Sequence, residues 1–355
     1  MRRAVAKAAL AGAAALLALP VLEIGYRLHV QRPVLKLEDW RTGRIEHIRF
    51  GDRTRFDAAL GWVPRDGFAS TGYNTLKHGI RRNFCEKGVR TGGILAVGDI
   101  FTNGGNEVAD GETWPAHLER LIDVPVLNAG FAGYGADQIA LRAEQLLPAV
   151  QPRTLVVGVF EDTIARVRYA TFGFPKPHYT IDRGNLVHHG PTPLLEEPLP
   201  DLRSRVRAAL GYSAVLDAVL AHAAPIYWLG NPSQQVFRTA DNDPVAVTCA
   251  LLQRLRTRAE AQGVRMLLLM QYARKTVESA EPGTDARQVA ACATALGVDV
   301  IDQIDTLRAA ATESPGALND FYLQSPGYGQ MTPKGNRATA QLLAGALSKV
   351  AALRK

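Results

Sequence analysis

Five residues whose side chains or backbone amide can do chemistry follow apolar, strand-like runs: Asp99, Thr102, Gly133, Glu161 and Asp162. Carboxylates can transfer protons, a hydroxyl can attack a carbonyl carbon, and an unhindered glycine amide can bind a negative oxygen. Asp99 and Asp162 can also act as an acid/base pair on a glycosidic bond, which requires their carboxyl groups to lie about 5 to 9 Å apart. The simpler interpretation of Asp99, which we favour, is a hydrogen-bonded loop carboxylate.

Apolar runs that predict strands alternate with stretches that show helical spacing. The predicted strands cover residues 94–97, 124–128, 154–160, 264–271 and 298–301, and the predicted helices cover 113–121, 136–147, 245–262 and 286–296. This alternation implies right-handed crossovers, and therefore a three-layer α/β/α sandwich around a mostly parallel five-stranded sheet. Ligands bind beyond the carboxyl ends of such strands, so residues 98–104, 129–135 and 161–165 are expected to line one crevice.

The first of these loops resembles a known active-site block. Residues 94–104, Ile-Leu-Ala-Val-Gly-Asp-Ile-Phe-Thr-Asn-Gly, are similar to the first block of the SGNH (GDSL-type) ester hydrolases, in which a strand runs into Gly-Asp-Ser-Phe-Thr-x-Gly. The nucleophilic serine of that family corresponds to Ile100, which has no oxygen and cannot be acylated. The resemblance extends to about residue 350 and implies the flavodoxin-like sheet of that family. It assigns Thr102 to loop packing, with a nucleophilic role as the alternative.

Three further blocks match the family in their scaffold residues and differ in their chemical ones. Residues 128–135 resemble the second block, and Gly133 occupies the place of the glycine whose backbone N–H faces the oxyanion. Residues 156–164 resemble the third block, with Asp162 in the place of the asparagine. Residues 328–336 resemble the last block, with Tyr328 in place of the aspartate and Met331 in place of the histidine. The resemblance therefore leaves no catalytic side chain intact.

These replacements remove the chemistry of a serine esterase. Met331 offers only a weak thioether acceptor and cannot carry a proton at neutral pH. An ionised Asp162 would repel the developing oxyanion, where the loss of one donor already costs about 3 kcal/mol. A rebuilt site is the alternative, in which His178, His188 or His189 of a predicted hairpin supplies the base.

The sequence therefore predicts a hydrolase-like scaffold with a changed role. Related anchored proteins act as esterases or acyltransferases on envelope polysaccharides, so the resemblance implies a carbohydrate-binding or accessory module that holds a carbohydrate or acylated glycan. The alternative is an active carbohydrate esterase or O-acyltransferase that uses unconventional residues. A third interpretation, an assembly partner without a small ligand, requires Ile100 and Met331 to pack together as an apolar plug.

The N-terminal segment has the pattern of an export signal. Basic residues up to Lys7 precede the apolar run 8–22, which is short for a spanning helix and lacks a clear cleavage site. We therefore favour a signal anchor over residues 1–29 rather than a cleaved signal peptide, with the main domain in the periplasm or otherwise outside the cytoplasm. A buried core helix is the alternative.

The remaining chain is expected to form an N-terminal arm over residues 30–90 and an SGNH-hydrolase-like domain over residues 91–355. Residues 166–243 interrupt the alternation of strands and helices, with a hairpin predicted across 176–187. We interpret this segment as a lid-like insertion beside the crevice, and a surface decoration is equally compatible with its sequence.

The composition of the 355 residues, 47% hydrophobic and 21% charged, is that of a globular chain. Its net charge of +7 comes from basic residues spread along the sequence. This distribution argues against nucleic-acid binding and leaves anionic lipid or acidic polysaccharide as partners. Cys85, Cys249 and Cys292 allow at most one disulfide and lack the spacing of a metal site. We expect neither a metal nor another cofactor.

Overall fold

The computed structural model describes residues 18–30, 34–35, 53–191, 206, 209–224, 237–240, 242–279, 283–314, 316–323 and 330–353. The chain divides into two compact units. The first, which we call the helical unit, contains residues 1–55 and 193–235. The second, the α/β unit, contains Phe56–Thr192 and Val236–Lys355. This division cuts through both the predicted arm at 30–90 and the predicted insertion at 166–243.

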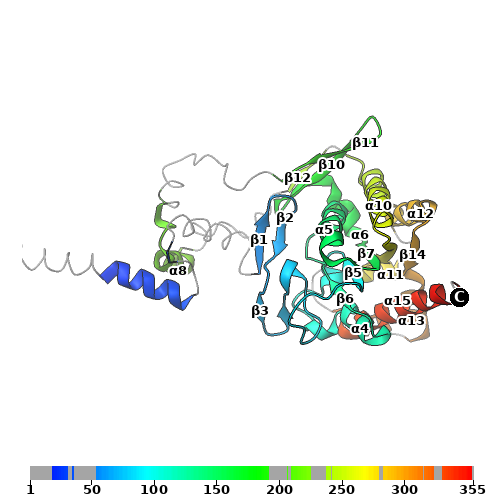
Figure 1. Cartoon of the computed structure of the whole chain (residues 1–355), viewed down its shortest axis with the longest axis horizontal. Coiled ribbons are helices and arrows are strands. Elements are labelled where there is room, and N and C mark those ends of the chain that lie inside the picture. Colours follow the sequence, from blue (N-terminus) through cyan, green and yellow to red (C-terminus); the bar gives the residue numbers. More distant parts are fainter. Residues whose placement is uncertain are drawn as a thin grey trace, which may run out of the picture. The chain divides into compact units, whose positions relative to one another are not determined.

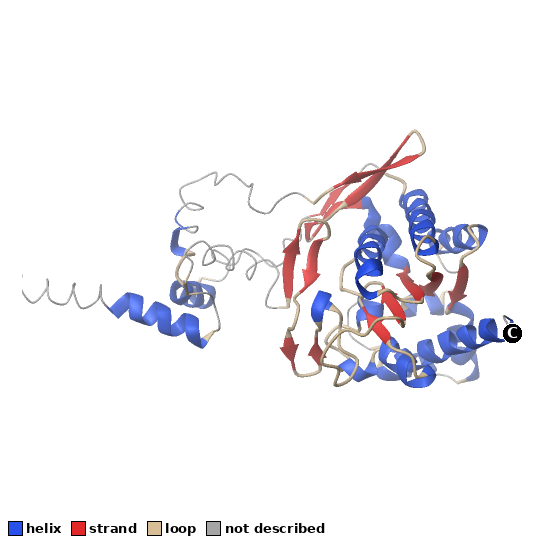
Figure 2. Ribbon diagram, in the orientation of Figure 1, coloured by secondary structure: helices blue, strands red, loops and turns tan. Residues whose placement is uncertain are grey.

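The α/β unit is built on a five-stranded parallel sheet (Figures 1 and 2). Its strands are β5 (Ile94–Val97), β6 (Val126–Asn128), β7 (Thr154–Phe160), β13 (Arg265–Gln271) and β14 (Asp299–Asp302). They lie in the order β6-β5-β7-β13-β14, which is the flavodoxin-like order 2-1-3-4-5. The predicted fold class is confirmed.

Helices cover both faces of this sheet (Figure 1). On one face lie α4 (Trp114–Ile122) and α15 (Pro333–Leu353), which bury Trp114 and Leu343 against alternate residues of β5, β7 and β13. On the other face lie α5 (Ala136–Val150), α10 (Pro244–Glu260) and α12 (Thr284–Ala295). There Ile139 and Leu251 pack toward Val157. Because neighbouring residues of a strand point to opposite faces, the inner strands β5 and β7 are apolar over most of their length, whereas the edge strand β14 begins and ends with aspartate.

Shorter helices follow the strands and shape their carboxyl ends. They are α3 (Ile100–Asn103) after β5, α6 (Glu161–Ala165) after β7, and α11 (Arg274–Glu278) after β13. The helices α13 (Ile304–Glu313) and α14 (Ala317–Phe321) connect β14 to α15. The carboxyl ends of β5, β7 and β13, where the crevice was predicted, are therefore each followed within a few residues by the start of a helix.

The residues before the sheet form short strand pairs and a buried polar centre. The pairs are β1 (Thr54–Asp57) with β2 (Gly61–Pro64), and β3 (Ala69–Ser70) with β4 (Tyr73–Asn74), followed by the 3-10 turn η1 (Lys77–Gly79). Arg81, 1% exposed, donates to the Asp110 carboxylate at 2.9 Å and to the carbonyl oxygens of Asn103 and Gly105 at 2.6 and 2.9 Å. This part of the predicted surface arm therefore enters the fold and fixes the loop after α3.

The part of the insertion that belongs to the α/β unit is a set of antiparallel strands. It begins with the turn η3 (Arg166–Arg168) and contains β8 (Tyr169–Phe172), β9 (Phe174–Pro175) and β12 (Phe237–Thr239) in one small sheet. The predicted hairpin is present as β10 (His178–Asp182) and β11 (Asn185–His189). Its turn residues Arg183 and Gly184 have φ of +47° and +81°, the conformation of a type I′ turn.

A buried ion pair fastens this insertion to the start of α5. Lys176 Nζ donates to the Asp137 carboxylate, and both side chains are 0% exposed. The same ammonium group donates to the carbonyl oxygens of Tyr169 and Pro177 at 3.0 and 2.9 Å. Burial raises the pKa of Asp137 and lowers that of Lys176, while the attraction between the two charges opposes both shifts. Since every proton of the ammonium group has an acceptor, the pair is satisfied without water.

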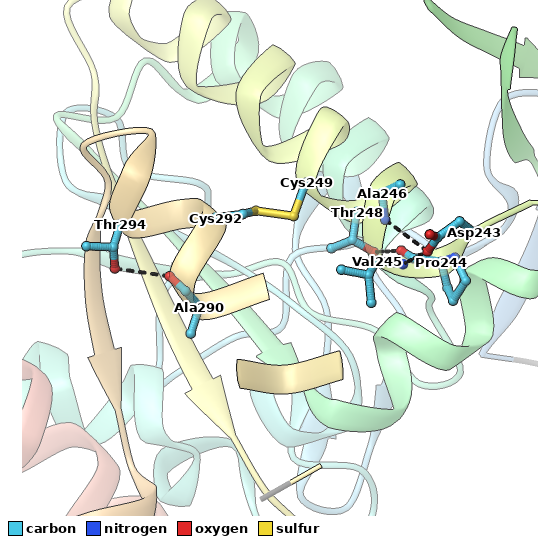
Figure 3. Close-up of a disulfide and its surroundings, with 9 residues drawn as sticks. All are labelled: Asp243, Pro244, Val245, Ala246, Thr248, Cys249, Ala290, Cys292 and Thr294. Carbon is cyan, nitrogen blue, oxygen red and sulfur yellow. Dashed lines mark hydrogen bonds between the residues drawn. A yellow bond between two sulfur atoms is a disulfide. The ribbon is translucent and has the colours of Figure 1, made fainter. Parts of the chain in front are cut away.

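A disulfide joins α10 to α12 (Figure 3). Cys249 and Cys292 are bonded, with their Cα atoms 6.1 Å apart, while Cys85 is free and exposed. The sequence allowed at most one bridge, and the structure has one among the described residues.

The helical unit contains a helix over residues 18–29 and α8 (Ala214–Ala223). Within the part of the chain that the structure describes, no helix combines the length and the apolar character needed to cross a membrane.

Candidate functional site

The carboxyl end of β5 leads directly into the crevice position that corresponds to the family's nucleophile. Asp99 is the N-cap of α3, and its carboxylate accepts a hydrogen bond from the Phe101 amide at 3.0 Å. The next residue, Ile100, opens the helix and is half-buried. Phe101 stacks on Phe160 at the end of β7, with ring centroids 4.2 Å apart. The backbone that presents a serine in the family is thus formed here, and it presents a hydrocarbon side chain.

The Asp99 carboxylate forms a buried ion pair with Arg166. Arg166 Nη1 donates to Asp99 Oδ2 at 3.0 Å and to the carbonyl oxygen of Tyr134 at 3.1 Å. Burial raises the pKa of the Asp99 carboxyl group, and the Arg166 guanidinium opposes that shift. Because Asp99 is 0% exposed, it is a bonded loop carboxylate in this structure rather than half of an exposed acid/base pair.

Thr102 is enclosed by three glycines. A Cβ atom added at Gly98, Gly130 or Gly158 would lie within 2.9 Å of an atom of the threonine side chain. The Thr102 hydroxyl is fully buried and has no hydrogen-bond partner among the described residues. Its position fits the packing role that the resemblance implied, since a ligand in the crevice cannot reach a hydroxyl that is buried on all sides.

Gly133, the candidate oxyanion donor, has a backbone conformation that favours glycine. Its φ of +80° is in the left-handed region that favours glycine. The residue is half-buried, and no acceptor in the described chain is bonded to its amide N–H. This amide is a candidate donor for a ligand oxygen.

The two carboxylates at the start of α6 have different roles. Glu161 Oε1 accepts hydrogen bonds from the Ala273 amide at 3.0 Å and from Thr276 Oγ1 at 2.6 Å, so it caps the start of α11. Asp162 is half-buried, and no donor within the described ranges is bonded to its carboxylate. Of the two, Asp162 is the one whose oxygens remain for a ligand.

The last sequence block requires a correction at Met331. Met331 is 4% exposed, and its sulfur accepts a hydrogen bond from Thr339 Oγ1 at 3.3 Å. The preceding residue, Gln330, is half-buried, and with its amide oriented to donate, its Nε2 lies 2.9 Å from Glu107 Oε2. In the family's pattern the histidine precedes the proline by three residues, so Pro333 places it at Gln330. The buried Met331 instead fills the hydrophobic position that follows the histidine.

The same spacing moves the aspartate of that block from Tyr328 to Gly327. Both of these residues lie outside the described part of the chain. An amide at Gln330 cannot take up a proton at neutral pH. The corrected position therefore supplies no general base, as was already the case for Met331.

Glu107 is a rim residue that the sequence analysis missed. Glu107 is exposed in the loop after α3. A Cβ atom added at Gly105 would collide with the Glu107 carboxylate and would lie 3.4 Å from Ile100 Cδ1. Arg81 holds the backbone of this loop through the carbonyl oxygen of Gly105. The Glu107 carboxylate therefore lies near Ile100, and Gln330 lies beside Glu107. The signal that could have identified Gln330 was the distance to Pro333, whereas nothing in the sequence singled out Glu107.

The three histidines of the hairpin lie on β10 and β11. His178 and His189 are paired across the strands with their rings stacked at 4.7 Å, and His189 Nε2 lies 2.9 Å from Thr180 Oγ1. Burial, together with the charge of His189, lowers the pKa of His178 to about 4. His188 packs on Tyr179, with ring centroids 5.1 Å apart. All three histidine rings therefore have packing contacts within the hairpin.

Comparison with known proteins gives matches only at the level of fold. No protein-family model and no curated protein matches the sequence.

Among the described residues, no group of three or more histidine, cysteine, aspartate or glutamate side chains is placed to hold a metal ion.

Several solved structures are similar to the chain at low identity. A lipase/acylhydrolase from Enterococcus faecalis is 14% identical over 72% of this chain and 95% of its own, with a TM-score of 0.39. A member of the lipolytic protein G-D-S-L family from Veillonella parvula is 14% identical over 72% of this chain and 97% of its own, with a TM-score of 0.38. Axe2, an acetylxylan esterase from Geobacillus stearothermophilus, is 11% identical over 72% of this chain and 93% of its own, with a TM-score of 0.39.

The fold itself rests on the strand order and on the residues around Ile100. Asn103 Nδ2 donates to the carbonyl oxygen of Gly130 at 2.9 Å, which joins the first block to the second. The Asp99–Arg166 pair joins the first block to the turn after the third, and the Glu107–Gln330 contact joins the loop after the first block to the last block. The α/β unit therefore has an SGNH-type hydrolase fold.

Proposed function

We propose that this chain is an SGNH-hydrolase-like protein without serine-esterase activity, which binds a carbohydrate or acylated glycan in its crevice as an accessory module of polysaccharide modification. The observation that carries the proposal is Ile100 at the first position of α3, with Gln330 at the place of the base. Acyl transfer needs a nucleophile and a group that takes its proton. A hydrocarbon and an amide supply neither.

Polar groups on the loops of the second, third and last blocks and on the loop after α3 support binding of a hydroxyl-rich ligand. The carboxylates of Glu107 and Asp162 can accept hydrogen bonds from sugar hydroxyl groups, and the amides of Gln330 and Gly133 can donate them. The Ile100 side chain offers an apolar contact for an acyl group. Sites of this kind combine a few convergent polar groups with an apolar floor.

Two features support a place at the cell envelope. The bond between Cys249 and Cys292 suits an oxidising compartment, because cytosolic reductants keep such thiols reduced. The basic start of the chain and the apolar run 8–22 have the pattern of a signal anchor. The proposed location is therefore outside the cytoplasm, with the membrane contacted through the N-terminal segment.

The alternative is an active carbohydrate esterase or O-acyltransferase built on another residue. The observation that favours it is the exposed Glu107 carboxylate beside Ile100, because carboxylates act as nucleophiles in some hydrolases. Loss of turnover in a Glu107→Gln variant would identify this alternative.

The test of binding uses the full-length protein, acetylated and unacetylated oligosaccharides, and isothermal titration calorimetry. We expect saturable binding that a Glu107→Gln exchange weakens about tenfold, as the loss of one charge-assisted hydrogen bond implies. Glu260→Gln, an exposed exchange on α10, is the matched control and should leave the affinity unchanged. Absence of binding to every glycan, or equal losses in the two variants, would contradict the proposal.

A further inference from the structure

The helix over residues 18–29 has its charged residues inside and its apolar residues outside. Its two buried side chains are Glu23 and Arg27, which are 8% and 1% exposed. Its exposed large apolar side chains are Leu19, Val21, Leu22, Ile24 and Leu28. A helix on the surface of a water-soluble protein shows the opposite arrangement. This inversion is typical of helices that contact lipid, where charged residues face a neighbouring helix and pair there.

The helix α8 of the same unit repeats the inversion. Asp217 is 5% exposed, while Leu216 and Val219 are 39% and 54% exposed. The sequence of α8, Ala-Val-Leu-Asp-Ala-Val-Leu-Ala-His-Ala, has few polar positions with which to cover that surface. Two helices about 190 residues apart in the chain thus expose apolar side chains in one unit.

The buried charges hold the two helices together. The Glu23 carboxylate accepts hydrogen bonds from Ser213 Oγ and the Ala214 amide, both at 2.7 Å, and therefore caps the start of α8. Arg27 Nε donates to Glu23 Oε1 at 2.6 Å, and its Nη2 donates to the carbonyl oxygen of Tyr212 at 2.7 Å. The polar groups of the pair are bonded to one another, and large apolar side chains make up much of the exposed surface of the two helices.

The charge of the adjacent sequence indicates which apolar medium covers this surface. Arg203, Arg205 and Arg207 precede α8, and Arg2 and Arg3 open the chain. Basic residues beside an apolar surface are attracted to anionic lipid headgroups. The helix α8 has ten residues and is about 15 Å long, shorter than the roughly 30 Å hydrocarbon core. The helix α8 therefore suits the interface of one leaflet.

We propose that helix 18–29 and α8 form a membrane-docking pair that inserts Leu216 and Val219 into the acyl region of an anionic bilayer. The insertion of the α/β domain thereby contributes a second membrane contact beside the N-terminal segment. The pair would hold the crevice-bearing chain at the lipid surface. This inference does not depend on what the crevice binds.

The test places an environment-sensitive nitrobenzoxadiazole dye at position 219 of the full-length chain. The dye is attached to a Val219→Cys exchange in a Cys85→Ser background, which leaves the disulfide intact. The matched control is Leu121→Cys, because Leu121 is 49% exposed on α4 of the α/β unit. Both proteins are mixed with phosphatidylcholine vesicles that contain phosphatidylglycerol, and nitroxide lipids labelled on the acyl chain are added as quenchers.

We expect a several-fold rise of dye fluorescence and acyl-chain quenching at position 219, with neither at position 121. Vesicles without phosphatidylglycerol should bind about tenfold more weakly, because the basic residues lose their partners. A second variant, Leu216→Ser with Val219→Ser, should lower vesicle binding, whereas Leu121→Ser should not. Both exchanges replace exposed side chains, so folding is preserved.

Three results would overturn the proposal. The first is vesicle-bound protein without acyl-chain quenching at position 219. The second is a rise of dye fluorescence without vesicles that grows with protein concentration, which would identify a second copy of the chain as the occupant. The third is a fluorescence that is high without vesicles at every concentration, which would mean that another part of the same chain covers α8.

Discussion

Asp99 and Arg166 form an ion pair at 3.0 Å in which neither side chain is more than 5% exposed. Asp99 immediately precedes Ile100 and caps α3, while Arg166 follows α6. The pair therefore links the start of α3 to the end of α6. Because both charges are satisfied by each other and by backbone groups, they position the crevice walls rather than contact a ligand.

Replacement of Arg166 by methionine tests this role. The exchange leaves the Asp99 carboxylate buried without its partner, so the free energy of unfolding should fall by about 3 to 5 kcal/mol. Chemical denaturation followed by circular dichroism measures this change. The control is Arg256→Met, which removes an exposed i,i+4 pair with Glu260 and should cost less than about 1 kcal/mol. Similar small losses in both variants would show that the buried pair is not structural.

Residue exchanges in the crevice test the corrected position of the family's base. Ile100→Ser alone should give no hydrolysis, because the new hydroxyl has no base beside it. Adding Gln330→His should raise the rate of fluorophosphonate labelling about a hundredfold over Ile100→Ser, which is the size of a general-base contribution.

Met331→His combined with Ile100→Ser provides the opposing control. Met331 is buried against Thr339, so a histidine there should lower stability and add no labelling. Labelling that depends on a histidine at position 331 and not at position 330 would restore the alignment we rejected.

Removal of the disulfide tests how strongly it ties α10 to α12. Cys249 and Cys292 are 43 residues apart, and closure of a loop of that size is worth about 4 kcal/mol in the chain-entropy description. The double exchange Cys249→Ser with Cys292→Ser should lower the thermal midpoint, and Cys85→Ser should leave it unchanged. An unchanged midpoint in the double variant would show that this bond does not contribute to stability.

The stacked histidines predict a pH dependence of the hairpin. Because burial and then the charge of His189 lower the pKa of His178 to about 4 from an ordinary value of 6.5, the unfolded hairpin binds the proton more readily. Stability should be complete above about pH 6.5 and should fall as the pH drops toward 4. NMR titration of the His178 ring measures its pKa directly.

His189→Asn provides the test of the cause. Removal of the neighbouring imidazole takes away one of the groups that lower the pKa, so the His178 titration should move upward. A His178 ring that titrates near 6.5 in the unaltered chain would contradict the contacts seen in β10 and β11.

The sheet was predictable because buried parallel strands are apolar throughout. The run that became β7 and the run that became β13 stand out from any neighbouring sequence for this reason. Four of the five predicted carboxyl ends agree with the structure, and the fifth differs by one residue. The roles of the residues that follow were less predictable, since burial and not residue type separates Asp99 from Asp162.

Other features depend on contacts that spacing cannot show. Glu23 ends the apolar run at the N-terminus, yet the helix continues past it because Arg27 and the start of α8 bond its carboxylate. Arg81 looks like a surface residue in the sequence and is buried because five carbonyl and carboxylate groups surround it. The register of the last block was predictable from Pro333, and the burial of Met331 makes the error plain.

We propose that no serine-type nucleophile lies at the position of Ile100, and covalent labelling tests this proposal most directly. The purified full-length protein is treated with a fluorophosphonate and assayed with an activated acetate and with acetylated sugars, beside an intact SGNH esterase as a positive control. We predict no label and no turnover. Stoichiometric labelling of one crevice residue, with turnover that disappears when that residue is exchanged, would contradict the account and place the chemistry at the labelled side chain.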